Sequence, residues 1–394
     1  MTPIRKFEKP LGMRDSFPLI NKQKEKVRDL GRAFFESRGF YFIKTPTVEF
    51  YETIGKASAI EDSSLFKLVD RQGETLVLRP DMTTPIVRVA TSKLLKEKIP
   101  LRLAYFANVF RAQEHEGGRP AEFEQMGVEL IGDSSVYADA EMILTASEFL
   151  EELGIQAYRL TVGHAGLLQS ILTELTQSDE QVKELRNLLV QKNLVGFEEQ
   201  INKYELSTDA EKHFFEFLSQ ASHMENIEQL RPYIDEDNPK QVEMFTYLNE
   251  LSSLLDQAGL NDKVTYDLTL TSEMSYYSGM LFEVFASGTG FAIGNGGRYD
   301  GLLKEFNSTM GATGFGLRVD RLLEVLTPSN ETRMHALIFF DNKHYMTAMH
   351  KAKKLRNEGI RTTLQYVESV DDKQTLQEHF SQVIWLVEGV NADE

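Results

Sequence analysis

The segment "VFRAQEHEGGRPAEFEQMGVELIG", residues 109–132, decides the fold of this 394-residue chain. Its pattern predicts two strands that are joined by the charged loop "EHEGGRP". Residues two or four apart in a strand share a face, so Gln125 and Glu129 point the same way. Gly127 lies between them and leaves room on that face because it has no side chain.

The polar residues of this segment suit a zwitterionic amino acid as ligand. Arg111 is able to bind a carboxylate or a phosphate through two parallel hydrogen bonds. Acids such as Glu129 accept hydrogen bonds from an amine or a ring N–H. A solvated sheet face with ordinary ion pairs explains the same residue types equally well. The segment alone therefore leaves both interpretations open.

The segment "LVLRPDMTTPIVR", residues 76–88, contains a second group of polar residues. Arg79, Asp81 and Thr83 alternate in it just after a strand-like run. These three side chains suit the polar rim of a site for an ammonium group. They also suit the start of a helix, with Asp81 or Thr83 as the N-cap. Taken alone, the segment favours the cap.

Two adjacent tyrosines, Tyr276 and Tyr277, precede the strand-like run "GMLFEVFA". They resemble the wall of a small-molecule pocket. In a regular strand the two rings would point to opposite faces, so only one of them is expected to face a given pocket. The other is expected to pack in the core.

The composition excludes several classes of function. A net charge of −17 disfavours binding to a phosphate backbone. The chain has no cysteine, which excludes disulfides and thiolate chemistry and fits the reducing cytoplasm. No apolar run approaches the length of about 18 residues that spans a membrane, and the first residues lack the apolar stretch of a signal peptide. The histidines are scattered, so no metal site is expected.

The pattern along the chain predicts an α+β fold with three parts. Residues 1–164 and 265–327 mix strands and helices. Residues 165–264 have a helical pattern with 19 acidic and 8 basic side chains, a net −11, and are expected to form an inserted helical domain. Residues 333–394 alternate strand and helix, which predicts a small, mostly parallel C-terminal α/β domain.

Together these stretches resemble the histidyl-tRNA synthetase catalytic domain, which is a class II aminoacyl-tRNA synthetase fold built on an antiparallel sheet. The resemblance runs from about Lys9 to Leu326 and includes the helical insertion. The matching segments occur in the family's order: "GMRDSFP" (12–18), "TPTVE" (45–49), "LRPDMT" (78–83), residues 109–132, "YYSGMLFE" (276–283), "GGRYDGL" (296–302) and "GFGLRVDRL" (314–322).

The resemblance implies a histidine pocket. The amine would lie near Asp81, Thr83 and Gln125, although the family usually has Glu in place of this Asp. The carboxylate would lie near Arg111, and Glu129 and Tyr277 would contact the imidazole. The full histidine-binding set implied is Asp81, Thr83, Arg111, Gln125, Glu129, Tyr277 and Tyr299.

Three departures from the family fall on its ATP contacts. Ser272 replaces the arginine that stabilises charge during adenylation, and Gln113 replaces the glutamate that would contact adenine. Arg318 stands where the family has a glycine that makes room for the nucleotide. A cation aimed at developing charge is usually a large catalytic contribution. The sequence therefore predicts a retained histidine pocket, no catalytic residues, no cofactor and no synthetase activity.

This pattern of losses resembles the regulatory subunits of short-form ATP phosphoribosyltransferase. That resemblance implies a hetero-oligomer with the short catalytic subunit in the first step of histidine biosynthesis, self-association as a dimer, and feedback inhibition by free histidine. It implies no membrane and no tRNA as partner. The alternatives are an active histidyl-tRNA synthetase and a tRNA-sensing pseudo-synthetase. The acidic insertion and the tail from residue 327, with 8 basic and 10 acidic residues, disfavour tRNA binding.

Overall fold

The chain divides into two compact units, Met1–Thr327 and Pro328–Glu394, and each has a hydrophobic core of its own. The computed structural model describes residues 7–55, 57–58, 60–94, 100–112, 120–176, 178–191, 193–204, 208–222, 224–271, 276–326 and 335–389.

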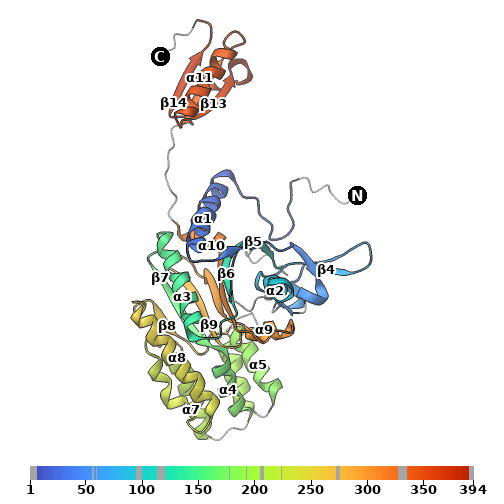
Figure 1. Ribbon diagram of the computed structural model, residues 1–394, viewed down its shortest axis with the longest axis vertical. Coiled ribbons are helices and arrows are strands. Elements are labelled where there is room, and N and C mark those ends of the chain that lie inside the picture. Colours follow the sequence, from blue (N-terminus) through green and yellow to red (C-terminus); the bar gives the residue numbers. More distant parts are fainter. Residues whose placement is uncertain are drawn as a thin grey trace. The chain divides into compact units, whose positions relative to one another are not determined.

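The larger unit is built on an eight-stranded sheet with the order β1-β5-β6-β11-β10-β9-β7-β8 (Figure 1). The five inner pairs are antiparallel, and the pair at each edge is parallel. The predicted antiparallel sheet is thus mixed at its edges. In sheet order the strands are Tyr41–Phe42, Leu101–Phe110, Glu122–Ile131, Ala312–Arg318, Gly294–Arg298, Met280–Ala286, Tyr158–His164 and Val264–Tyr266.

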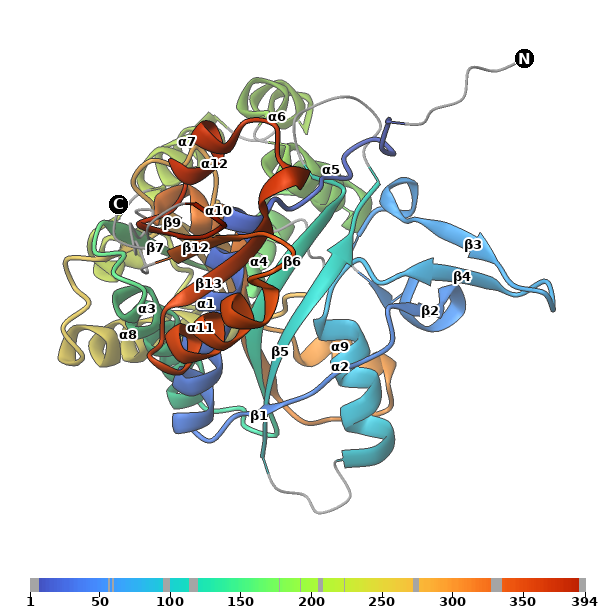
Figure 2. The same ribbon diagram turned by 90° about the horizontal axis from the view of Figure 1, so that it is seen from above.

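The two faces of this sheet are covered by different helices. Helices α1 (Pro18–Ser37), α3 (Val136–Glu152) and α10 (Val319–Val325) pack on one face around the fully buried ring of Phe35. Helices α2 (Thr83–Val89) and α9 (Asp300–Glu305) contact each other on the other face (Figure 2).

The larger unit also contains a small antiparallel sheet with the strand order β2-β4-β3. Strands β3 and β4 form an antiparallel hairpin whose turn contains Gln72 and Gly73. The bounds of these strands are Val48–Phe50, Thr75–Leu78 and Lys67–Val69. Short 3-10 or π turns lie at Tyr51–Gly55, Asp62–Ser64, Ala90–Leu94, Asn202–Tyr204, Ile227–Tyr233 and, in the smaller unit, Val367–Ser369.

Five helices follow β7 and share the hydrophobic core of the sheet. Their starts are defined locally, because Ser178, Asn193 and Asn238 each accept a hydrogen bond from a backbone N–H of the first turn. The predicted boundary of an inserted domain at residues 165–264 stays a prediction. The helices are α4 (Ala165–Leu175), α5 (Asp179–Val190), α6 (Leu194–Ile201), α7 (Thr208–Ala221) and α8 (Pro239–Gln257).

The smaller unit has a three-stranded sheet in the order β13-β12-β14, with every pair parallel. This arrangement confirms the parallel α/β pattern that was predicted for the tail. Trp385 stacks on Phe339 with 4.2 Å between ring centroids. The elements are β12 (His335–Phe340), α11 (Tyr345–Asn357), β13 (Arg361–Tyr366), α12 (Lys373–Gln377) and β14 (Gln382–Leu386).

Phe35→Ala should lower the free energy of unfolding of the larger unit by about 3–5 kcal/mol, because the ring packs on Phe34, Phe149 and Phe315. The midpoint of urea unfolding, followed by far-UV circular dichroism, should fall. Trp385 is the only tryptophan of the chain, and its fluorescence reports on the smaller unit. The midpoint of urea unfolding followed by this fluorescence should therefore equal that of the wild type. The exposed Val195→Ala serves as the control. An unchanged dichroism midpoint would show that Phe35 is not a core residue.

Candidate functional site

A pocket lies on the α2 and α9 face of the large sheet. It encloses about 310 Å³ of space, part of which is open to solvent. Strands β5, β6, β10 and β11, the start of α2 and the turn before β9 contribute to it. Its lining residues are Asp81, Thr83, Tyr105, Gln125, Glu129, Tyr276, Tyr277, Asn295, Tyr299, Gly314, Phe315 and Gly316.

Glycines form the floor of the pocket and make room for its polar side chains. Gly314 lies opposite Glu129 in the register of β11 and β6, and Gly316 lies opposite Gly127. A Cβ atom on Gly314 would lie 2.0 Å from Oε2 of Glu129, and one on Gly316 would lie 2.2 Å from Nε2 of Gln125. These distances are far too short for any other residue, so the glycines are required for the polar groups to lie over the sheet.

Glu129 is the most buried acid of the pocket, with 1% of its surface exposed. Its Oε2 accepts a 2.5 Å hydrogen bond from the hydroxyl of Tyr299, and its Oε1 accepts a 2.8 Å hydrogen bond from the hydroxyl of Thr83. Both bonds favour the ionised carboxylate, but desolvation by burial outweighs them and raises the pKa of Glu129 to about 8. This carboxyl group therefore holds a proton over much of the neutral range.

Asp81 serves the helix and the pocket at once. Its Oδ1 accepts a 2.8 Å hydrogen bond from the backbone N–H of Thr84, which satisfies one donor of the first turn of α2. Its Oδ2 is buried and has no hydrogen-bond partner among the described residues, and the same holds for Oε1 of Gln125. Burial raises the pKa of Asp81. The N-cap of α2 is Met82, so the prediction that Asp81 or Thr83 is the N-cap is wrong. Both residues line the pocket.

Among the described residues, the lining of the pocket contains two buried carboxyl groups and no lysine, arginine or histidine. An unpartnered acceptor in a buried site is costly, and a ligand that brings N–H donors and positive charge offsets that cost. The arrangement therefore suits an amine or a protonated ring.

Both tyrosines of the adjacent pair line the pocket, and the expectation that only one would do so is wrong. Strand β9 begins at Met280, so Tyr276 and Tyr277 lie in the turn before it and the alternation of a strand does not apply. The ring of Tyr276 lies edge-on to Tyr277 and Tyr299, at 5.1 and 6.0 Å between centroids. The hydroxyl of Tyr277 accepts a 3.2 Å hydrogen bond from Nδ2 of Asn295.

Six of the seven residues predicted for the ligand line this pocket, and Arg111 does not. Nε of Arg111 donates a 3.2 Å hydrogen bond to the carbonyl of Pro80, and its guanidinium lies 5.4 Å from the ring centroid of Phe123. The positive charge of Arg111 lowers the pKa of Asp81, but burial raises that pKa by more. Arg111 thus acts on the pocket through Asp81 from behind the lining.

Sequence reasoning missed Tyr105, Tyr276 and Asn295. Tyr105 lies opposite Gly127 in the register of β5 and β6. Strand alternation alone was therefore enough to place its ring on the ligand-facing side. Asn295 is opposite Gly316 in β10 and β11, and no signal in the sequence marks it before that register is known.

Of the three positions that differ from the synthetase nucleotide site, Gln113 and Ser272 lie outside the described residues. Arg318 lies opposite Gln125 at the end of β11. Its guanidinium lies 3.8 Å over the ring of Phe123 and forms a 3.0 Å ion pair with Asp320. The role of these three positions as lost ATP contacts stays a prediction.

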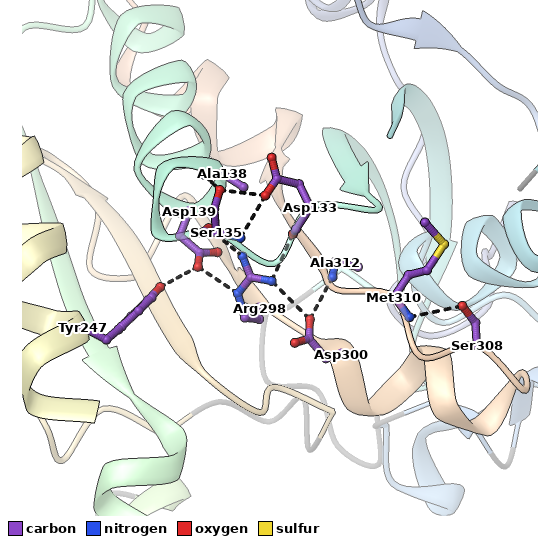
Figure 3. A network of polar contacts seen from close by, with 10 residues as sticks. All are labelled: Asp133, Ser135, Ala138, Asp139, Tyr247, Arg298, Asp300, Ser308, Met310 and Ala312. Atoms are coloured by element: carbon purple, nitrogen blue, oxygen red, sulfur yellow. Dashed lines mark hydrogen bonds and ion pairs between the residues drawn. The ribbon is translucent and has the colours of Figure 1, made fainter. Parts of the chain in front are cut away.

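A buried polar network surrounds Arg298, which is the last residue of β10 and precedes Tyr299 (Figure 3). Nε of Arg298, the preceding residue, donates a 2.8 Å hydrogen bond to Oδ2 of Asp139 in α3. The hydroxyl of Tyr247, in α8, donates a 2.5 Å hydrogen bond to the same oxygen. Arg298 also pairs with Asp300 at 3.3 Å. The network therefore joins α3, α8 and the edge of the pocket.

The described part of the chain contains neither a cluster of metal ligands nor a helix that could cross a membrane. No three histidine, aspartate or glutamate side chains among those residues gather closely enough to hold a metal ion. No helix in the same residues is both long and apolar enough to cross a membrane.

Two family models match the chain. The model described as histidyl-tRNA synthetase matches residues 12–322, and the model described as histidyl-tRNA synthetase HisZ, C-terminal domain, matches residues 337–388. ATP phosphoribosyltransferase regulatory subunits are similar over nearly the whole chain. That of Lysinibacillus sphaericus is 54% identical and covers 96% of this chain and 97% of its own. That of Bacillus subtilis is 42% identical and covers 97% of each chain.

Solved structures agree with these matches. The crystal structure of an ATP phosphoribosyltransferase regulatory subunit/histidyl-tRNA synthetase from Bacillus halodurans C has a TM-score of 0.88 and 38% identity, and it covers 98% of this chain and 99% of its own. Histidyl-tRNA synthetase from Nostoc sp. PCC 7120 has a TM-score of 0.74, covers 95% of this chain and 88% of its own, and is 19% identical. The latter shows the shared fold alone.

Glu129→Gln should make the stability of the unliganded protein less dependent on pH. The folded pKa of about 8 lies above the ordinary value of 4.5, so between these pH values the folded state binds more protons than the unfolded state. The free energy of unfolding therefore falls as pH rises, by up to about 1.4 kcal/mol per pH unit from this group. Urea unfolding at pH 5, 6, 7 and 8 measures that slope.

The amide of the variant does not titrate, so its slope should be smaller than that of the wild type. The control is Glu305→Gln in α9, where the carboxyl group is exposed. That variant should keep the wild-type slope. Equal slopes in Glu129→Gln and the wild type would contradict a buried, protonated Glu129.

Proposed function

This chain belongs to the histidyl-tRNA synthetase family, in its group of ATP phosphoribosyltransferase regulatory subunits, and we propose that its pocket binds free histidine as the signal for feedback inhibition. The group's role is regulatory and not catalytic, as the sequence predicted. The catalytic partner in our proposal is a short-form ATP phosphoribosyltransferase subunit, bound in a hetero-oligomer. Self-association of the chain as a dimer stays a prediction.

The observation that carries the proposal is the unpartnered Oδ2 of Asp81 beside the buried carboxyl group of Glu129. Histidine brings an ammonium group, which is a donor that Oδ2 of Asp81 lacks. It also brings a ring N–H, which would add a donor to Glu129, whose oxygens already accept hydrogen bonds from Tyr299 and Thr83. The amine fits between Asp81, Thr83 and Gln125. The imidazole fits against Glu129 and the edge of Tyr277, where aromatic walls exclude water.

Histidine acts on a partner only if it binds two states of the complex with different affinity. The pocket has a route for such coupling. Tyr299 bonds to Glu129, and the adjacent Arg298 pairs with Asp139, which also accepts a hydrogen bond from Tyr247 of α8. A ligand that shifts Glu129 therefore acts on a network that reaches α3 and α8.

The direct test is an assay of the short catalytic subunit alone, with this chain, and with this chain plus histidine. Activity should rise when the chain is added and fall when histidine is added. If the chain neither raises the activity nor makes it sensitive to histidine, the proposal is contradicted.

Asp81→Asn should weaken histidine binding at least about tenfold, because a hydrogen bond to a charged group is lost and an amide N–H₂ faces the ammonium group. Isothermal titration calorimetry of the whole chain measures the Kd. The matched control is Glu74→Gln, which removes an exposed acid from the turn before β4 and should bind histidine as the wild type does. Wild-type affinity in Asp81→Asn would place the amine elsewhere.

An active histidyl-tRNA synthetase is the second candidate, because the larger family model and the Bacillus halodurans relative carry that name. Histidine-dependent exchange between ATP and pyrophosphate distinguishes the two. We expect no exchange, since by the resemblance Arg318 replaces a glycine that makes room for the nucleotide, and in this chain it forms an ion pair with Asp320. Ser272→Arg alone should not restore exchange, because Gln113 and Arg318 remain. Clear exchange by the unaltered chain would favour the synthetase.

A further inference from the structure

A second cavity lies where helices α4 and α5 meet the chain around β9. Four of its seven lining residues are alanine or leucine, and Tyr277 lines both this cavity and the first pocket. Among the described residues, the single charged group in its lining is the guanidinium of Arg186, from α5. The lining residues are Ala165, Leu168, Arg186, Leu270, Thr271, Tyr277 and Leu281.

Arg186 is half-buried and has fewer hydrogen-bond partners than the two buried arginines, Arg79 and Arg298. Arg79 donates to the backbone carbonyls of Asn108 and Thr45, and Arg298 pairs with two carboxylates. Arg186 has one 3.3 Å hydrogen bond from Nη1 to Oε1 of Gln169. No carboxylate of the described residues lies within ion-pair distance of it, and burial lowers its pKa.

A shortage of acids does not explain this isolation. Residues 165–264 carry 19 acidic and 8 basic side chains, and the exposed Arg231 in the same region pairs with Glu228 at 2.8 Å. A guanidinium has five N–H donors, and a half-buried cation with one neutral acceptor carries a desolvation cost. An anion in the cavity offsets that cost and accepts two parallel hydrogen bonds from the planar guanidinium.

We propose that Arg186 and the second cavity form a binding subsite for a small oxyanion, a carboxylate or a phosphate. Acids line the first pocket and the isolated cation lines the second, and Tyr277 belongs to both walls. The anion is either the carboxylate of the amino acid in the first pocket or a separate phosphate. The first source rests on the proposed function, and the second does not.

Calorimetry of the whole chain distinguishes the two sources with four ligands: histidine, histamine, inorganic phosphate and pyrophosphate. Histamine keeps the imidazole and the amine of histidine and lacks its carboxylate. If the carboxylate binds Arg186, Arg186→Gln raises the Kd of histidine at least about tenfold and leaves that of histamine unchanged. If a separate anion binds, the variant raises the Kd of phosphate or pyrophosphate by a similar factor and leaves histidine unchanged.

Two further variants complete the experiment. Arg186→Lys keeps the positive charge and should recover part of the lost affinity. Arg231→Gln removes the paired, exposed arginine of the same region and should bind all four ligands as the wild type does. Thermal unfolding of each variant confirms that it is folded.

Three outcomes overturn the subsite. They are wild-type affinities in Arg186→Gln for every ligand that binds, an equal loss of histidine and histamine binding, and a wild-type chain that binds neither histidine nor any phosphate. Phosphate binding that depends on Arg186, in a chain that does not bind histidine, would uphold the subsite and refute the proposed function. The two failures are therefore distinguishable.

Discussion

The carboxyl group of Glu129 lies buried over the middle of an antiparallel sheet, and the rest of the pocket depends on keeping it there. Glycines opposite it leave the space that any Cβ atom would fill. Hydroxyl groups of Tyr299 and Thr83 hold its two oxygens. The backbone of Tyr299 is in turn anchored by Arg298, whose ion pair with Asp139 lies in the core. The position of Glu129 therefore depends on glycines in the strands and on the packing of the helices, and it sets the chemistry of the pocket.

The distribution of charge follows from the same burial. Two carboxyl groups and several aromatic rings line the first pocket above its glycine floor, and no cation lies in its lining among the described residues. Arg111 lies behind Asp81, and Arg186 lines the neighbouring cavity. In our two proposals, a zwitterionic ligand would meet acids in the first pocket and a cation in the second cavity, which would distinguish it from a simple amine.

Local periodicity predicted part of the site, and the resemblance to the synthetase family implied the rest. Glu129 and Gln125 share a face whatever the rest of the chain does, because side chains alternate along every strand. The same rule failed for Tyr276 and Tyr277, which lie in a turn that the sequence did not mark. It also said nothing about Asn295, because that residue faces the pocket only through the register of β10 and β11.

The sequence by itself determined the strands, the helical segment, the parallel C-terminal unit and most of the residues that line the pocket. Each of these follows from short-range patterns of apolar and polar residues, or from motifs whose order resembles one family. Three features could be known only from the tertiary structure. The edge pairs of the sheet are parallel, Arg111 does not line the pocket, and Arg186 has no carboxylate partner among the described residues. Those features depend on which segments distant in sequence pack together, and burial then changes what each charge does.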